Sequence, residues 1–116
     1  MGPARLIWRS EIYEVDLGTP VGREPARVRP GVIVSADLIN NGSGQLVGIV
    51  PITSRDYALR SHVELEPGVT GLDHVSFARC DQVRMISDHR LRTLQGRAPV
   101  DSMESINWAL RFIFDL

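Results

Sequence analysis

The chain has 116 residues, of which 43% are hydrophobic and 23% charged, and its formal net charge at pH 7 is −1. This length and composition predict one globular domain over residues 1–116 and exclude a disordered chain, while the near-neutral charge excludes wholesale electrostatic adhesion to nucleic acid. No apolar run approaches the roughly 20 residues of a membrane helix and no signal-peptide pattern is present, so we expect a cytoplasmic protein without membrane contact.

The first half of the chain predicts short strands separated by one long loop. Residues 11–17 alternate between two sides, one apolar with Tyr13, Val15 and Leu17 and one more polar with Ile12, Glu14 and Asp16. This alternation predicts a half-buried strand. Residues 18–30 contain two glycines and three prolines among charged residues, so they predict a loop. Pro51 removes a hydrogen-bond donor and predicts one-sided or bulged pairing near the end of its strand. Further strands are predicted over residues 31–35, 46–52, 62–65 and 75–86.

A short helix is predicted after these strands. Ser87 and Asp88 are typical N-cap residues, and they predict a helix that runs through Leu94 and ends at Gly96.

The last predicted helix begins at Asp101 or Ser102 and has one apolar face. Trp108 and Phe112 point away from that face, which predicts a second covered surface, namely a subunit interface. The apolar face consists of Met103, Ile106, Leu110, Ile113 and Phe114. Several short strands followed by helices predict a mostly β domain with peripheral α (α+β), either a small barrel or a strongly bent sheet.

The long loop and the end of a later strand carry residues suited to a phosphate group. Arg29 precedes Pro30, and a pre-proline residue is held extended, so its five-donor guanidinium lies at a stiff junction. Glu24 supplies a carboxylate in the same loop, and Thr53 and Ser54 place two hydroxyls at a strand end. From the residues alone, a solvated loop that leads into a core strand remains an alternative.

A polar group formed by Asp81, Gln82 and Arg84 interrupts residues 75–86, and such side chains require partners or ligands. Arg29, Thr53 and Ser54, with Glu24, Gln82 and Arg84 as further candidates, can gather around one phosphate. If the substrate is RNA, its own 2′-hydroxyl can then attack the adjacent phosphorus without a metal ion. The three histidines are scattered and the single cysteine stands alone, so no metal or other cofactor is expected.

Five segments occur together in a specific order and spacing: EIYEVDL, GREPARVRPGVIVS, VPITSR, HVEL and DHVSFARCDQVRMI. From residue 11 to the C-terminus, the chain resembles the MazF/PemK family of toxin endoribonucleases (mRNA interferases) of type II toxin–antitoxin systems. The resemblance implies a small SH3-like antiparallel β-barrel with a C-terminal helix, as in the CcdB toxins, and a homodimer. It also implies metal-independent cleavage of single-stranded RNA (mRNA, tRNA or rRNA) to a 2′,3′-cyclic phosphate and a 5′-hydroxyl, and silencing by a cognate antitoxin.

The resemblance assigns roles to individual residues. Arg29 and Thr53 match the catalytic arginine and threonine of the family, and Glu24 matches a glutamate important in some members. Ser10, Pro25 and Arg27 depart from common family residues, and Pro25 is expected to stiffen the loop. With the polar residues noted above, the expected RNA contacts are Arg23, Arg27, Ser54, Arg55, Gln82 and Arg84.

Two other functions stay open. One is a non-catalytic toxin that poisons a protein target such as a gyrase, as CcdB toxins do, although a poison does not need a pair such as Arg29 and Thr53. The other is an RNA-binding or structural β-module without catalysis.

Overall fold

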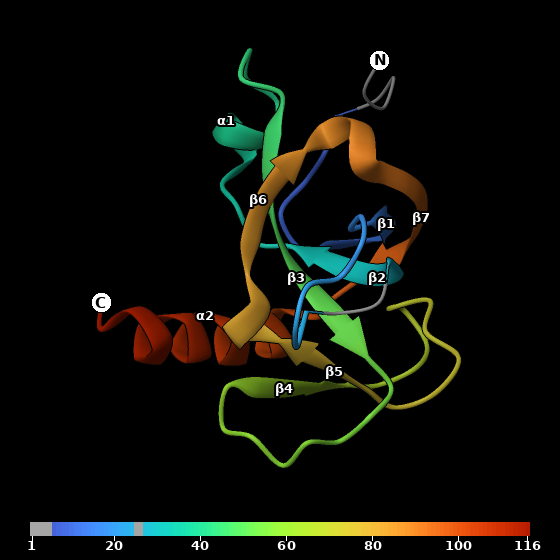
Figure 1. Ribbon diagram of the computed structural model, residues 1–116, viewed down its shortest axis with the longest axis vertical. Helices are drawn as coiled ribbons and strands as arrows, with labels where there is room; N and C mark the ends of the chain where they lie inside the picture. Colours follow the sequence, from blue (N-terminus) through green and yellow to red (C-terminus); the bar gives the residue numbers. More distant parts are fainter. Residues whose placement is uncertain (1–5, 25–26) are drawn as a thin grey trace.

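The computed structural model describes residues 6–24 and 27–116, which fold into a bent antiparallel sheet with one long C-terminal helix (Figure 1). The strands are β1 (Glu11–Asp16), β2 (Val28–Ile33), β3 (Leu46–Thr53), β4 (His62–Leu65), β5 (Ser76–Arg79), β6 (Arg84–Ser87) and β7 (Leu91–Arg97). The helices are α1 (Asp37–Asn40) and α2 (Val100–Phe114), with 3-10 turns η1 (Cys80–Gln82) and η2 (Asp88–Arg90). Neither α1 nor α2 is long and apolar enough to cross a membrane.

Strand β3 lies at the centre of the sheet. The strand order is β4-β5-β3-β2-β1-β7, with every pair antiparallel, and β6 pairs with β3 outside this order. The first half of β3 pairs with β6 and its last two residues, Ile52 and Thr53, pair with β5. On one side of β3, Pro51 lies between the stretch paired with β6 and the stretch paired with β5, and on the other side it pairs with Gly31 of β2. This agrees with the one-sided pairing predicted for a proline, which has no N–H to donate. The sheet is not closed among the described residues, so the α+β prediction is confirmed as an open, bent sheet instead of a complete barrel.

Both faces of the sheet are covered, because the bend creates two apolar cores. Ile12 belongs to one core, which α2 covers with Met103 and Ile106, whereas Tyr13 and Val15 belong to the other. The prediction of a half-buried strand was therefore wrong for Ile12, which is fully buried.

Strand β2 begins earlier than the sequence predicted. Arg29 and Pro30 belong to β2 and not to the loop, and they pair with Val15 and Glu14 of β1. The second neighbour of β2 begins to pair only at Gly31, so Pro30 lies in a stretch with one partner strand among the described residues, where a missing donor is tolerated. Pro25 lies outside the described residues.

The region from Val75 to Arg97 contains the largest errors of prediction. The strand predicted over residues 75–86 is two strands, β5 and β6, separated by η1. The helix predicted from Ser87 to Leu94 is wrong: η2 forms a single turn, and β7 then pairs with β1. Gly96 does not stop a helix but lies within β7, where a Cβ atom would approach the Val69 carbonyl oxygen to 2.3 Å.

The last helix was predicted in the right place, but it begins at Val100 after Pro99 and not at Asp101 or Ser102. Met103 and Ile106 of the predicted apolar face are buried, whereas Phe114 is exposed. Trp108 and Phe112 are 68% and 67% exposed, as expected for side chains that point away from the core.

Candidate active site

One hollow of the molecule lies where β2 begins and β3 ends. The pairing of β2 with β3 ends at Gly31 and Pro51, and Arg29 and Thr53, each two residues beyond it, both line this hollow. The hollow has a volume of about 390 Å³, and we call it the arginine pocket. Its lining consists of Arg23, Glu24, Arg29, Ile52, Thr53, Tyr57, Leu59, Arg79, Asp81 and Gln82.

A second, smaller hollow of about 220 Å³ adjoins the arginine pocket. Both hollows are lined by Arg29, Ile52 and Thr53, and Ser54 lines only the smaller one. Its other walls come from three strands and from the loop after β4. The residues are Gly71, Leu72, Asp73 and His74 of this loop, Pro30 of β2, Ser76 of β5 and Gln95 of β7. A chain-like ligand whose reactive group contacts Arg29 and Thr53 can therefore extend to either side of that pair.

The side chains at the centre are available for a ligand. Within residues 6–24 and 27–116, the guanidinium of Arg29 has no hydrogen bond or ion pair. The Thr53 hydroxyl accepts a hydrogen bond from the Arg55 N–H at 3.2 Å, which leaves its own proton to donate. Glu24 accepts a hydrogen bond from the Val21 N–H at 2.7 Å, which holds its carboxylate in the turn of the loop.

Four residues in or beside the arginine pocket were not among the predicted site residues: Tyr57, Arg79 and Asp81, which line it, and His62, which contacts Asp81 and Tyr57. Arg79 donates a hydrogen bond to the Arg23 carbonyl at 3.4 Å and lies 5.2 Å from the centre of the Tyr57 ring. His62 contacts Asp81 at 2.9 Å between Nε2 and Oδ1. His62 pairs with Arg79 between β4 and β5, and only this register, which the sequence does not reveal, brings the four together.

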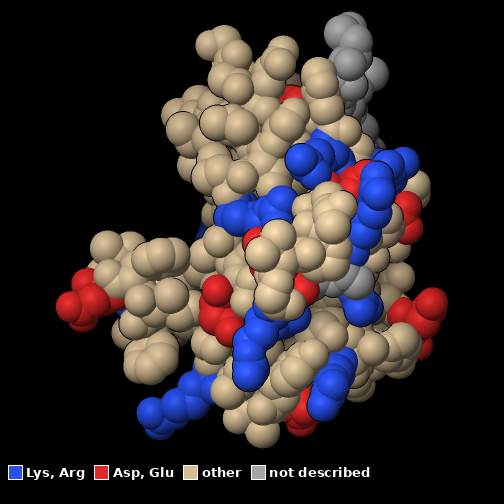
Figure 2. All heavy atoms as spheres, in the orientation of Figure 1, with Lys and Arg blue, Asp and Glu red and all other residues tan. Residues whose placement is uncertain are grey.

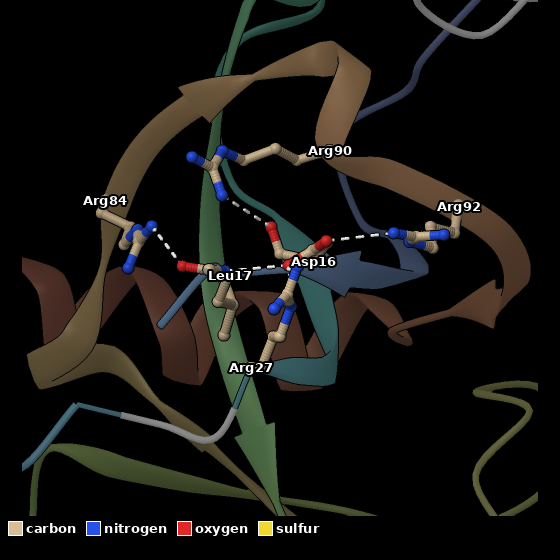
Figure 3. A network of polar contacts seen from close by, with 7 residues as sticks. Asp16, Leu17, Arg27, Arg84, Arg90 and Arg92 are labelled. Atoms are coloured by element: carbon tan, nitrogen blue, oxygen red, sulfur yellow. Dashed lines mark hydrogen bonds and ion pairs between the residues drawn. The ribbon is translucent and has the colours of Figure 1, made fainter. Parts of the chain in front are cut away.

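Three of the predicted RNA contacts lie outside both hollows. Arg55 packs on Tyr57, with 4.9 Å between its guanidinium carbon and the ring centre, so it lies at the rim of the arginine pocket. Arg27 and Arg84 belong instead to a group of arginines at the base of the β1–β2 loop, which we call the Asp16 network (Figure 3).

The Asp16 network joins four arginines from distant parts of the chain. Arg92 and Arg27 contact the Asp16 carboxylate at 3.0 and 3.5 Å. Arg90 donates to the Asp16 carbonyl at 3.2 Å, and Arg84 donates to the Leu17 carbonyl at 2.9 Å. The N–H of Gly18 and the Arg92 guanidinium lower the pKa of the Asp16 carboxyl, so Asp16 stays ionised.

Basic side chains cluster on the face that carries these groups. In the view of Figure 2 they gather at the centre and right, around the β1–β2 loop, while the upper left, over α1, carries few charges. Acidic side chains lie between them in the same view, so the positive charge of this face consists of separate arginine groups.

Nucleophilic and metal chemistry find little support in the described residues. Burial, and then the charge of Asp81, raise the pKa of the Cys80 thiol to about 12, so it stays protonated and unreactive at neutral pH. In residues 6–24 and 27–116, no three His, Cys, Asp or Glu side chains lie close enough together to hold a metal ion.

Comparison with known proteins identifies the family. Residues 8–114 match the model of the PemK-like, MazF-like toxins of type II toxin-antitoxin systems. The chain belongs to this toxin family. It is 33% identical to endoribonuclease MazF9 of Mycobacterium tuberculosis over 113 residues, which covers 93% of this chain and 96% of the relative. It is 26% identical to endoribonuclease EndoA of Bacillus subtilis over 107 residues, covering 91% of this chain and 92% of the relative.

Solved structures share the fold of this toxin. MazF from Deinococcus radiodurans superposes with a TM-score of 0.80 at 22% identity, covering 97% of this chain and 99% of that one. A mycobacterial endoribonuclease in complex with its cognate antitoxin superposes with a TM-score of 0.78 at 23% identity, covering 95% and 96%. The predicted family and fold are thereby confirmed.

Proposed function

We propose that this toxin is a metal-independent endoribonuclease that cuts single-stranded RNA with the substrate's own 2′-hydroxyl as nucleophile. The observation that carries the proposal is the position of Arg29 and Thr53, which line two adjoining hollows, one of them lined by three arginines. The curated relatives are named endoribonucleases, which supports the same activity here.

The reaction assigns a separate task to each central residue. The 2′-oxygen attacks the adjacent phosphorus, a bond to the 5′-oxygen breaks, and the products are a 2′,3′-cyclic phosphate and a 5′-hydroxyl. Arg29 stabilises the negative charge that develops on the five-coordinate phosphate, and Thr53 donates a hydrogen bond to the same group. Glu24 takes the proton of the 2′-hydroxyl, and a proton from solvent reaches the leaving 5′-oxygen. The arginine pocket has two carboxylates, Glu24 and Asp81, and each makes one contact within the protein. We assign the task to Glu24 because it matches a glutamate that is important in some members of the family.

The remaining pocket residues bind the substrate instead of reacting with it. Arg23 and Gln82 line the arginine pocket and Ser54 lines the smaller hollow, so these three side chains contact RNA on the two sides of the cut. Arg27, Arg55 and Arg84 contact more distant phosphates or the antitoxin from the rim and from the base of the loop.

The decisive experiment incubates the purified protein with single-stranded RNA in excess EDTA. We expect defined fragments with 2′,3′-cyclic phosphate and 5′-hydroxyl ends, identified by mass spectrometry. Intact RNA at high protein concentration would contradict the proposal and favour a toxin that poisons a protein target. Fragments with 5′-phosphate ends would contradict the 2′-hydroxyl mechanism. Mapping the 5′ ends of cut transcripts would then give the recognition sequence and the preferred class of RNA, whether mRNA, tRNA or rRNA.

The toxin acts as a homodimer in this proposal. Trp108, Phe112 and Ala109 of α2 form, with Val63 of β4, one side of a hollow of about 480 Å³ in which two large aromatic side chains are exposed. Exposed aromatic area of this kind is typical of a subunit interface. We expect a dimer by light scattering at micromolar concentration and a monomer for Trp108→Glu. A monomeric wild-type protein would contradict this assembly.

The cognate antitoxin is expected to be a small acidic chain that binds close to the arginines of the β1–β2 loop. The solved mycobacterial endoribonuclease with its antitoxin supports a partner of this kind. Both proteins act in the cytoplasm, where their RNA targets are found.

A further inference from the structure

The ring of Tyr57 is fixed in place without being buried. It is 40% exposed and lies in the loop between β3 and β4, at residues 54–61. The edge of the His62 ring contacts it at 5.7 Å between ring centres and an interplanar angle of 84°. The side chain of His62 is only 2% exposed and is held by Asp81, so Tyr57 rests on a rigid support.

Two arginines complete this arrangement. The guanidinium carbons of Arg55 and Arg79 lie 4.9 and 5.2 Å from the centre of the Tyr57 ring, within the range of a cation–π contact. Arg79 also donates to the Arg23 carbonyl, which ties the ring to the β1–β2 loop. We call Tyr57 with these two arginines the tyrosine platform.

The tyrosine platform belongs to the same hollow as the central pair. Tyr57 and Arg79 line the arginine pocket together with Arg29 and Thr53. A held, exposed aromatic ring beside cations is the arrangement with which proteins bind unpaired bases of single-stranded nucleic acid, since the ring stacks on the base and the cations face its phosphates.

We propose that Tyr57 is the stacking site for one unpaired base of the RNA substrate, next to the phosphate that Arg29 and Thr53 hold. This inference rests on the endoribonuclease function proposed above. Every base has a π-face, so stacking here fixes the position of the strand in the arginine pocket instead of the identity of the base. Both guanidiniums lie over the ring, so the exposed Arg55 moves off the face that receives the base and binds the phosphate beside it. Arg79, which donates to the Arg23 carbonyl, keeps the ring oriented.

The test combines variants of Tyr57 with RNA that lacks one base. An oligonucleotide with the mapped cleavage site is prepared intact and with a single abasic nucleotide at each position around the cut. Wild type, Tyr57→Phe and Tyr57→Ala are compared on each RNA in EDTA, with melting temperatures to confirm that both variants fold. Arg29→Ala provides the reference for lost chemistry.

On intact RNA, we expect Tyr57→Ala to lower kcat/KM roughly 10- to 100-fold, mainly through KM, and Tyr57→Phe to cleave like wild type. On RNA that is abasic at one position, wild type should lose activity by a similar factor, and the difference between wild type and Tyr57→Ala should disappear. That dependence on one base is the signature of stacking, since a loop that only needs Tyr57 for its structure would lose activity equally on every RNA.

Two results overturn the inference while leaving the proposed function intact. One is an equal loss for Tyr57→Ala on intact RNA and on every abasic RNA. The other is full cleavage by Tyr57→Ala combined with weaker inhibition by the antitoxin, which would make the platform a protein contact. If wild type itself cuts no RNA, the proposed function fails, and the inference fails with it.

Discussion

The two groups of arginines on either side of the β1–β2 loop differ in the partners of their guanidiniums. In the Asp16 network, Arg27 and Arg92 contact one carboxylate, while Arg84 and Arg90 donate to main-chain carbonyls. In the arginine pocket, Arg29 has no hydrogen bond or ion pair with any residue that the structure describes. The guanidiniums of the Asp16 network are occupied by the protein itself, whereas that of Arg29 in the arginine pocket is left for an anion.

This difference separates stability from function in a chain whose basic residues are all arginine. A guanidinium already bound to a carboxylate or carbonyl fixes the loop that carries Arg23 and Glu24. An unpaired guanidinium close to a free hydroxyl proton offers preorganised donors to a phosphate, with no internal bond to break first. The same residue type thus acts in two ways, and its partners decide which.

The largest expected effect comes from one truncation made in each group. We expect Arg29→Ala to lower the rate of RNA cleavage on the order of 10²- to 10³-fold, because it removes donors that face the developing charge. We expect Arg92→Ala, the same change in the Asp16 network, to alter the rate by less than about threefold, because an exposed ion pair contributes little. Initial rates on the same RNA in EDTA measure both.

Full cutting by Arg29→Ala would remove Arg29 from the reaction. An equally large loss in Arg92→Ala would show that the two groups are not functionally distinct. Melting temperatures of both variants serve as the control that neither loss reflects unfolding.

One wall of the smaller hollow beside Arg29 and Thr53 depends on close backbone packing at Gly71. Its φ is +74°, and a Cβ atom there would lie 2.0 Å from the Gln95 carbonyl oxygen of β7. We expect Gly71→Ala to lower the free energy of unfolding by on the order of 3 kcal/mol, because both the clash and the backbone conformation oppose the new methyl group.

Two other glycines separate the cost of the backbone conformation at Gly71 from the cost of the clash. Gly22 has a φ of +60°, but no described atom lies within 4 Å of the position that a Cβ atom would take there. Gly44 has neither a positive φ nor a described neighbour within that distance. We expect Gly22→Ala to cost about 1 kcal/mol and Gly44→Ala less than about 0.5 kcal/mol. Urea denaturation measures all three, and equal values for Gly71 and Gly44 would contradict the close packing.

The strands that the sequence predicted well are those with a strong local pattern. Strand β4 has the bounds predicted for residues 62–65, and β1 differs from its prediction by one residue at its end. Strand β7 was missed because Ser87 and Gly96 are typical of helix ends, whereas pairing with β1 and the close approach of Val69 decide the structure. Local signals failed where distant partners determine the backbone.

The same limit applies to the site. That Arg29 and Thr53 belong to one site was implied by the family resemblance, and their positions beside strand ends only made it possible. The tyrosine platform could not be predicted, since it depends on the pairing of His62 with Arg79. Nor could the sequence reveal that Arg92 contacts Asp16, because the two are 76 positions apart and no local pattern joins them.

The smallest expected effect comes from the charge at the centre of the Asp16 network. We expect Asp16→Asn to lower the melting temperature by only a few degrees at pH 7, because Arg27 and Arg92 are 67% and 55% exposed and water screens their charges. RNA cleavage should change little, since Asp16 lines neither of the two hollows that Arg29 and Thr53 share.

The pH dependence of the difference in melting temperature between wild type and Asp16→Asn tests whether the charge of Asp16 causes it. The Gly18 N–H and the Arg92 guanidinium lower the pKa of Asp16 in the folded protein, so its stabilising contribution is fully present above the ordinary carboxyl pKa of about 4. It is lost as the pH falls through the lowered folded-state pKa, where the carboxylate takes up a proton. The melting temperatures of wild type and Asp16→Asn should therefore differ by a constant amount between about pH 5 and 8 and converge below about pH 4. A difference that grows as the pH falls would contradict the lowered folded-state pKa of Asp16, since it would mean that protonation of this carboxyl favours the folded protein.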